Sequence, residues 1–342
     1  HIRFDLNVGI LDFLGSRFHN FSLHADKHGP EWTTDVTSQE VIGKIHWNAA
    51  GKKKATAKLK KLVVPESLPE TDLSKKKQHA PQNWPIIDLH ADEFFYKGRL
   101  LGQLTLLAGQ NEEDWVINQM EIFHKHSTFT ANGIWKNQRQ PFLMNAEIKL
   151  TATDIGKFLN RVGYPDRIAR GEGNLEGHLS WQGKPFSVDF PSLSGQLKLT
   201  AKHGQFTKFK PGMSKLLGIF DLKALPRRLT LDFYDIFSQG FGFDDILGNV
   251  RIDHGIATFA GLEIAGSSAY LAVSGEINLD QETQSLRIKM FPSLGLVTPV
   301  IGIASMIADL SLKDPFGRVM FNEYAITGTW DEPLVRKLSE EN

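Results

Sequence analysis

The side chains that could do acid–base or metal chemistry in this sequence fall into a few small groups. His124 and His126 stand two residues apart, the spacing that places two imidazoles on one face of a strand. No third ligand follows at a suitable spacing, so we interpret them as solvent-facing histidines and expect no metal site. The acidic groups Asp244-Asp245 and Glu112-Glu113-Asp114 lie next to expected turns, where such residues are common.

These groups do not predict catalysis. The sequence has no cysteine, which excludes disulfides, thiolate catalysis and cysteine-ligated metals. It also has no glycine-rich phosphate loop, no Gly-x-Ser-x-Gly elbow and no His-Glu-x-x-His motif. Arg227 and Arg228 precede an expected strand, where they could contact phosphate headgroups or line a solvated sheet edge. We therefore expect no catalytic residue, no cofactor and no enzyme.

Composition narrows the class of protein further. The 342 residues contain 39 basic and 39 acidic side chains, and this zero net charge disfavours a nucleic-acid partner. The hydrophobic content of 41% excludes a disordered chain. The lack of cysteine is compatible with an oxidising compartment such as a bacterial periplasm. Because the chain begins with His1 and not Met, we expect it to be a segment of a longer protein or a processed product.

A short pattern recurs along the chain: a glycine followed by apolar residues two apart. We interpret each copy as a tight turn that opens a strand with one apolar and one polar face. Repetition of such strands predicts a mainly β protein, a long antiparallel meander of neighbouring strands. The copies begin at Gly43, Gly102, Gly195, Gly248, Gly275 and Gly317.

The meander is divided by one polar segment and a few helices. Residues 65–83 are rich in Pro, Ser, Lys, Glu and Gln and predict an exposed loop or linker, with strands in 1–64 and a larger domain in 84–342. Three stretches with helical spacing predict short helices near 153–162, 211–220 and 293–309. The last two strands are expected at Val319–Tyr324 and Ala325–Trp330, followed by a polar tail from Asp331 to Asn342.

Three short helices cannot cover the apolar face of so many strands, because one helix shields about two strands. The rest of that face must pack on itself in a closed sandwich or barrel, or form an open groove that holds something apolar. The groove interpretation predicts that Asn249, Arg251, Arg287 and Lys289 point to water. It places these apolar side chains in the groove: Val250, Ile252, Leu271, Val273, Ile277, Leu286, Ile288 and Met290.

The stretch from Met290 to Ala308 has no charged residue. Its length is close to that of a membrane span, but prolines and glycines interrupt it, so a transmembrane helix is disfavoured. It could instead be a buried helix that caps the open end of the sheet, or an apolar segment that enters a membrane surface. The apolar residues expected near the membrane are Leu296, Val297, Val300, Ile301, Ile303, Met306 and Ile307.

One long segment resembles a known family. Leu225–Phe233 runs into Asp235–Phe241 and then Gly248–Ile252, and this order resembles the C-terminal region of the YhdP family of AsmA-like proteins from Gram-negative bacteria. Shorter pieces agree in order, among them Gly171–Gly177 and Gly328–Pro333. The resemblance covers at least residues 43–335.

The resemblance implies a fold and a role. AsmA-like proteins are similar to bridge-like lipid transfer proteins, with a long sheet rolled into an open, taco-like apolar groove. It implies helices near the groove and at the C-terminal end, and a periplasmic portion of an inner-membrane-anchored protein with its C-terminal end towards the outer membrane. The implied role is a non-enzymatic phospholipid conduit that reaches the inner leaflet of the outer membrane and supports its lipid homeostasis and permeability barrier. The alternative is a periplasmic scaffold that binds envelope proteins, as yet unknown, through its sheet edges.

Overall fold

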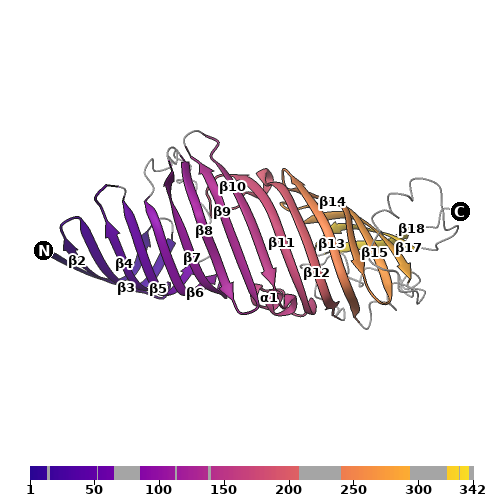
Figure 1. Cartoon of the computed structure of the whole chain (residues 1–342), viewed down its shortest axis with the longest axis horizontal. Helices are drawn as coiled ribbons and strands as arrows, with labels where there is room; N and C mark the ends of the chain where they lie inside the picture. The colour runs from indigo at the N-terminus through magenta and orange to yellow at the C-terminus, as the bar shows by residue number, and fades with distance from the viewer. Residues whose placement is uncertain are drawn as a thin grey trace. The chain divides into compact units, whose positions relative to one another are not determined.

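The computed structural model describes residues 1–13, 16–51, 53–64, 85–111, 114–137, 140–207, 240–292, 322–330 and 332–338. Its strands belong to one 18-stranded, mostly antiparallel sheet (Figure 1). The chain divides into two compact units. Unit 1 comprises His1–Ala152, Phe158–Gly163 and Glu176–Asp189, and unit 2 comprises Thr153–Lys157, Tyr164–Leu175 and Phe190–Asn342.

Unit 1 is built from ten strands and the C-terminal part of β11 (Ile168–Gln182). Each of the ten pairs with its neighbour in the chain, and all these pairs are antiparallel except β5 with β6, which is parallel. The strands are β1 (Ile2–Phe13), β2 (Ser16–His28), β3 (Glu31–Thr37), β4 (Val41–Asn48), β5 (Lys54–Val64), β6 (Ile86–Tyr96), β7 (Arg99–Asn111), β8 (Asp114–His124), β9 (Ser127–Lys136) and β10 (Leu143–Ala152).

Unit 2 continues the same design with sequential antiparallel pairs from β12 to β18. A short 3₁₀ turn (Phe190–Ser192) precedes its first complete strand. The strands are β12 (Ser194–Phe206), β13 (Phe241–Asp253), β14 (Ile256–Ala265), β15 (Ala269–Asn278), β16 (Thr283–Pro292), β17 (Asn322–Thr329) and β18 (Pro333–Leu338).

The predicted antiparallel meander is therefore confirmed, and so is the first predicted helix, which is α1 (Ile155–Val162). The helices predicted near 211–220 and 293–309, and the linker predicted at 65–83, lie outside the described residues. The division into domains and the taco-like groove stay predictions.

The prediction for the last two strands is wrong. Val319 lies outside the described residues, and Tyr324 and Ala325 belong to one strand, β17, where a boundary between two strands was expected. The second strand, β18, lies within the expected polar tail and pairs with β17. Its residues Pro333 and Val335 are buried, with Val335 only 5% exposed, so two buried residues two apart accompany the added strand.

The interpretation of the repeated glycines as turn residues is wrong for Gly102 and Gly275. Gly195 does open a strand, as the second residue of β12, and Gly317 lies outside the described residues. Gly102 lies within β7 and Gly275 within β15, with positive φ angles of 134° and 122°. Register shifts occur in the ladders beside both glycines, between Phe94 and its neighbours and between Phe259 and Leu262. These two copies of the repeat therefore mark irregular positions inside strands, where the backbone bends and the neighbouring strand comes close.

Helix α1 packs on two glycines of β11. Asp154 caps its N-terminus, because the Oδ1 atom accepts a hydrogen bond of 2.9 Å from the Lys157 backbone N–H. A Cβ atom at Gly173 would lie 2.9 Å from the Cδ1 atom of Ile155, and one at Gly171 would lie 3.4 Å from it. Because neither glycine has a side chain, Ile155 of the helix can pack directly against β11.

A buried polar turn joins β3 and β4 to the rest of unit 1. Glu40 accepts a 2.8 Å hydrogen bond from the backbone N–H of His19, its carboxylate lies 2.7 Å from the imidazole of His19, and Ser38 donates to it at 3.2 Å. Burial alone raises the pKa of Glu40, but the hydrogen bonds from His19 and Ser38 outweigh burial and hold the pKa below its usual value.

We expect this turn to make the stability of unit 1 depend on pH. A carboxyl group with a depressed pKa contributes stability above its unfolded pKa of about 4.5, and that contribution is lost as the pH falls through its lower folded value. Urea unfolding between roughly pH 3 and pH 7 should show a smaller acid loss for Glu40→Gln than for the wild type. Glu147→Gln, which changes an exposed carboxylate on β10, is the control. Equal acid loss in both variants would contradict the assignment.

Candidate functional site

The apolar residues predicted from 250 to 290 lie on one face of unit 2. Val273 pairs with Ile288 and Leu271 with Met290, and all four side chains are at most 2% exposed. Leu286 and Ile252 are buried as well, whereas Val250 and Ile277 are half-buried. The predicted outward residues Asn249, Arg251, Arg287 and Lys289 are all exposed. The alternation is thus confirmed, while contact of these residues with lipid stays a prediction.

The same face contains buried aromatic residues that the sequence argument did not select. The rings of Phe206 and Phe243 lie 5.2 Å apart, and both side chains belong to one cluster with Leu271 and Ile288. The alternation of Phe241 and Phe243 was a usable signal. The other members that the prediction missed include Ala201, Ile246, Ile264, Tyr324, Ile326 and Val335.

Unit 1 has an apolar face of its own, which the sequence argument assigned to strands but not to a site. We use this term for one cluster on β1 to β8, whose described members are more often half-buried than buried. Other apolar side chains of unit 1, such as Ile117, Trp135 and Met144, are buried outside this cluster. The buried members are Phe21, Val36, Val41, Ala57, Leu59, Ala91, Phe94 and Leu104. The half-buried members are Leu6, Val8, Leu11, Phe18, Leu23, Ile45, Leu62, Leu89, Leu101, Met120 and Ile122. A larger share of this cluster is half-buried than of the cluster in unit 2.

A polar cluster lies where this face meets the end of β8. Arg161 of α1 donates hydrogen bonds to the Nδ1 atom of His124 and to the Oγ atom of Ser127. Burial lowers the pKa of His124, and the positive charges of Arg161, His126 and Lys125 lower it further. Burial also lowers the pKa of Arg161. A neutral His124 is the form that can accept a hydrogen bond from Arg161.

The prediction that His124 and His126 are solvent-facing histidines on one strand is wrong. β8 ends at His124, and His126 lies in the two-residue turn that leads to Ser127. Both side chains are half-buried, with ring centroids 5.8 Å apart. No group of three or more potential metal ligands occurs in the described part of the chain.

Of the acidic candidates, only Asp244 and Asp245 are placed differently from the prediction. Asp244 and Asp245 lie inside β13 rather than at a turn, and Asp245 forms an ion pair of 3.9 Å with Lys202 on β12. Asp114 is the first residue of β8, while Glu112 and Glu113 lie outside the described residues. The described carboxylates, Asp114, Asp244 and Asp245, therefore belong to strands and do not form a common site.

Two further predicted groups lie outside the described residues. They are the possible headgroup contacts Arg227 and Arg228, and the apolar residues Leu296, Val297, Val300, Ile301, Ile303, Met306 and Ile307. In the part of the chain that the structure does describe, no helix is long and apolar enough to cross a membrane.

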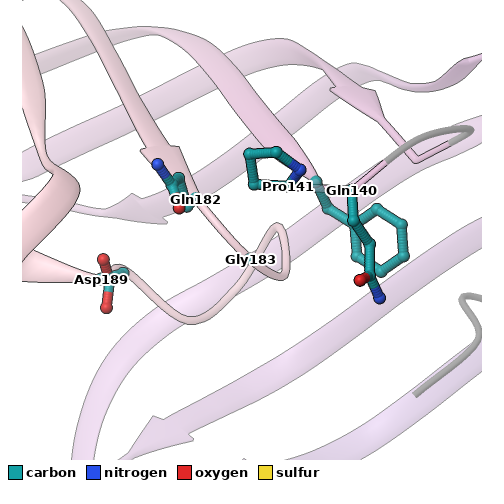
Figure 2. A pocket seen from close by; sticks show the side chains of 6 residues that line it. Gln140, Pro141, Gln182, Gly183 and Asp189 are labelled. Carbon is teal, nitrogen blue, oxygen red and sulfur yellow. The ribbon is translucent and has the colours of Figure 1, made fainter. Parts of the chain in front are cut away.

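A shallow depression of about 620 Å³ lies near the β9–β10 connection (Figure 2). Gln140, Pro141, Phe142, Gln182, Gly183 and Asp189 line it. The indole N–H of Trp135 donates a 2.7 Å hydrogen bond to the carbonyl oxygen of Gly183, and the ring of Trp115 packs perpendicular to that of Trp135. The residues that line this depression include no nucleophile beside a base. The contacts of Trp135 and Trp115 pack the end of the strands and do not form a site.

These observations define a class of protein: a large open β-sheet, paired strand by strand, with few helices among its described residues and with apolar and charged side chains on opposite faces. The chain belongs to the YhdP family, because the family model described as YhdP protein matches residues 2–335.

A curated relative supports this assignment. The chain is 24% identical over 267 residues to the intermembrane phospholipid transporter YhdP of Escherichia coli (strain K12). The aligned region is 75% of this chain but only 21% of the relative, so the chain spans about a fifth of that protein. No solved structure matches the chain.

Proposed function

We propose that this chain is part of a non-enzymatic phospholipid conduit between the inner and outer membranes, in which acyl chains lie along the apolar faces of the sheet. The observation that carries the proposal is the half-covered apolar face of unit 1, where side chains such as Leu62, Met120 and Ile122 pack against the buried cluster but stay partly exposed. Apolar surface left in water costs about 25 cal/mol per Å², and bound acyl chains would remove that cost.

The relative's name is consistent with this proposal, since that protein is described as an intermembrane phospholipid transporter. We further propose that the chain is a periplasmic portion of an inner-membrane-anchored protein and that it delivers lipid towards the inner leaflet of the outer membrane. In this role the protein binds and guides its cargo without making or breaking covalent bonds.

The scaffold alternative also has an observation in its favour. On β1, Ile2, Phe4 and Ile10 are each about half exposed, at 56%, 49% and 59%. An exposed apolar strand is the kind of surface on which a partner strand can be added. This alternative predicts a protein partner on β1 and no lipid on the apolar face of unit 1.

Photo-crosslinking at two adjacent positions of β8 separates these functions. A photoreactive residue at Ile122, on the apolar face, is expected to yield phospholipid adducts in cells. The same residue at Phe123 is the control, because that side chain is apolar but 46% exposed on the opposite face of the strand. Adducts at 122 and not at 123 support the conduit. Equal yields at the two positions, or none at 122, would overturn it.

A further inference from the structure

We propose that Arg161, Arg99 and His124 form a site for the phosphate group of a phospholipid at the rim of the apolar face of unit 1. This inference rests on the proposed function and adds to it the place where a headgroup is held. It differs from the sequence prediction, which placed headgroup contacts at Arg227 and Arg228.

The guanidinium group of Arg161 is only partly used by its protein neighbours. Its two Nη atoms donate to His124 and Ser127, but its Nε atom is buried without a hydrogen-bond partner. Among the described residues, no carboxylate forms an ion pair with Arg161. Each Nη atom carries a second N–H group, and a phosphate oxygen is a strong acceptor for guanidinium groups.

Arg99 brings a second guanidinium group to the same end of α1. A Cβ atom placed on Gly163 would lie 2.5 Å from the Cζ atom of Arg99, so the guanidinium rests directly on this glycine. Gly163 follows Arg161 by two residues. The turn residue Lys125 adds a third positive charge, and none of these three cations forms an ion pair within the described part of the chain. The rim is therefore positively charged.

The site borders apolar surface, which selects a lipid over a soluble phosphate compound. His124 lies two residues beyond Ile122 on the same side of β8, and Ile122 pairs with Leu104 on β7 and Phe129 on β9. A phospholipid held by its phosphate at Arg161 can thus place its acyl chains on Ile122 and its neighbours. The cations match the phosphate group of such a lipid, and the apolar face matches its acyl chains.

A purely structural role for the arginines is the simpler alternative. Cations at a helix C-terminus interact favourably with the helix dipole, and Arg161 lies in the last turn of α1. This role explains why the cations gather there. It does not provide an anionic partner for Arg161 among the described residues.

Binding of three probes to the full chain tests the proposal. The probes are dihexanoylphosphatidylglycerol, dihexanoylglycerol, which lacks the phosphate, and inorganic phosphate. The variant is Arg161→Gln, and the control is Lys157→Gln, which removes one exposed positive charge from the same helix. We expect Arg161→Gln to weaken phospholipid binding by about tenfold, as the loss of a charge-assisted hydrogen bond predicts. Dihexanoylglycerol binding and the Lys157→Gln variant should be unchanged.

A titration of His124 by NMR gives a second readout in the wild type. An anion bound beside the imidazole favours its protonated form, so the phospholipid should raise the pKa of His124, against the opposing charges of Arg161, Lys125 and His126. This measurement decides the question even if Arg161→Gln does not fold.

The outcomes separate the site from the conduit. If the wild type binds neither lipid, the proposed function fails. The phosphate site fails and the conduit stands under three joint results. The wild type binds both lipids equally, Arg161→Gln does not change phospholipid affinity, and the phospholipid does not change the pKa of His124. If inorganic phosphate alone raises the pKa of His124 and competes fully with the phospholipid, the site binds free phosphate and the lipid assignment is overturned.

Discussion

Gly275→Ala is expected to lower the free energy of unfolding by about 3 kcal/mol, a large effect for the addition of one methyl group. Gly275 has a φ angle of 122°, which side chains rarely tolerate. In addition, its Cβ atom would lie 2.2 Å from the carbonyl oxygen of Ser285 and 2.9 Å from the Cα atom of Leu286. Both contacts are with the backbone of β16, so the neighbouring strand has to move.

A glycine on the adjacent strand provides the control. Gly261 on β14 is exposed and has no positive φ angle, and no atom lies within 4 Å of the place that a Cβ atom would take. Gly261→Ala should leave stability within about 1 kcal/mol of the wild type or raise it slightly, because alanine restricts the unfolded chain. Urea unfolding of both variants checks the result. Equal stabilities would show that β15 does not need glycine at this bend.

Ile122→Glu is expected to reduce binding of a short-chain phospholipid by more than tenfold. Its side chain is half-buried on the apolar face of unit 1, so the carboxylate can reach water when the face is empty. When acyl chains cover the face, the same charge has to be desolvated, which costs several kcal/mol without a partner. The variant should therefore fold but fail to bind lipid.

Phe123→Glu is the matched control for this variant. The two positions are adjacent on β8 and receive the same new charge, but Phe123 is 46% exposed on the opposite face. Phospholipid affinity of Phe123→Glu should equal that of the wild type. Circular dichroism verifies that both variants are folded. Normal lipid affinity in a folded Ile122→Glu variant would remove the apolar face of unit 1 from the proposed function.

The sequence was sufficient to predict the strands and their faces in much of unit 2. Leu271 and Val273 alternate with outward positions, and so do Ile288 and Met290, and local alternation is all that a strand face requires. The glycines were misinterpreted for a physical reason. A glycine before alternating residues looks the same whether it opens a turn or bends a strand, and only the partner strand near Gly102 or Gly275 decides.

The sequence contained no comparable signal for the site of Arg161, Arg99 and His124. Arg161 and His124 are 37 residues apart, and they meet only because α1 follows β10 at the same end of the strands as the β8–β9 turn. The sequence does not predict which residues a single arginine in a helix or a single histidine at a hairpin will contact. Pairing of β7 to β10 had to be known before these side chains could be placed together.

The parallel pair of β5 and β6 has a consequence for how unit 1 assembles. Every other neighbouring pair from β1 to β10 is joined by a connection of at most six residues, so each hairpin can form locally. The connection between Val64 and Ile86 is about ten times longer than a two-residue turn, and closing it costs about 2 kcal/mol more in chain entropy. We therefore expect two nucleation regions, β1–β5 and β6–β10, whose joining along a single ladder is the slowest folding step of this unit.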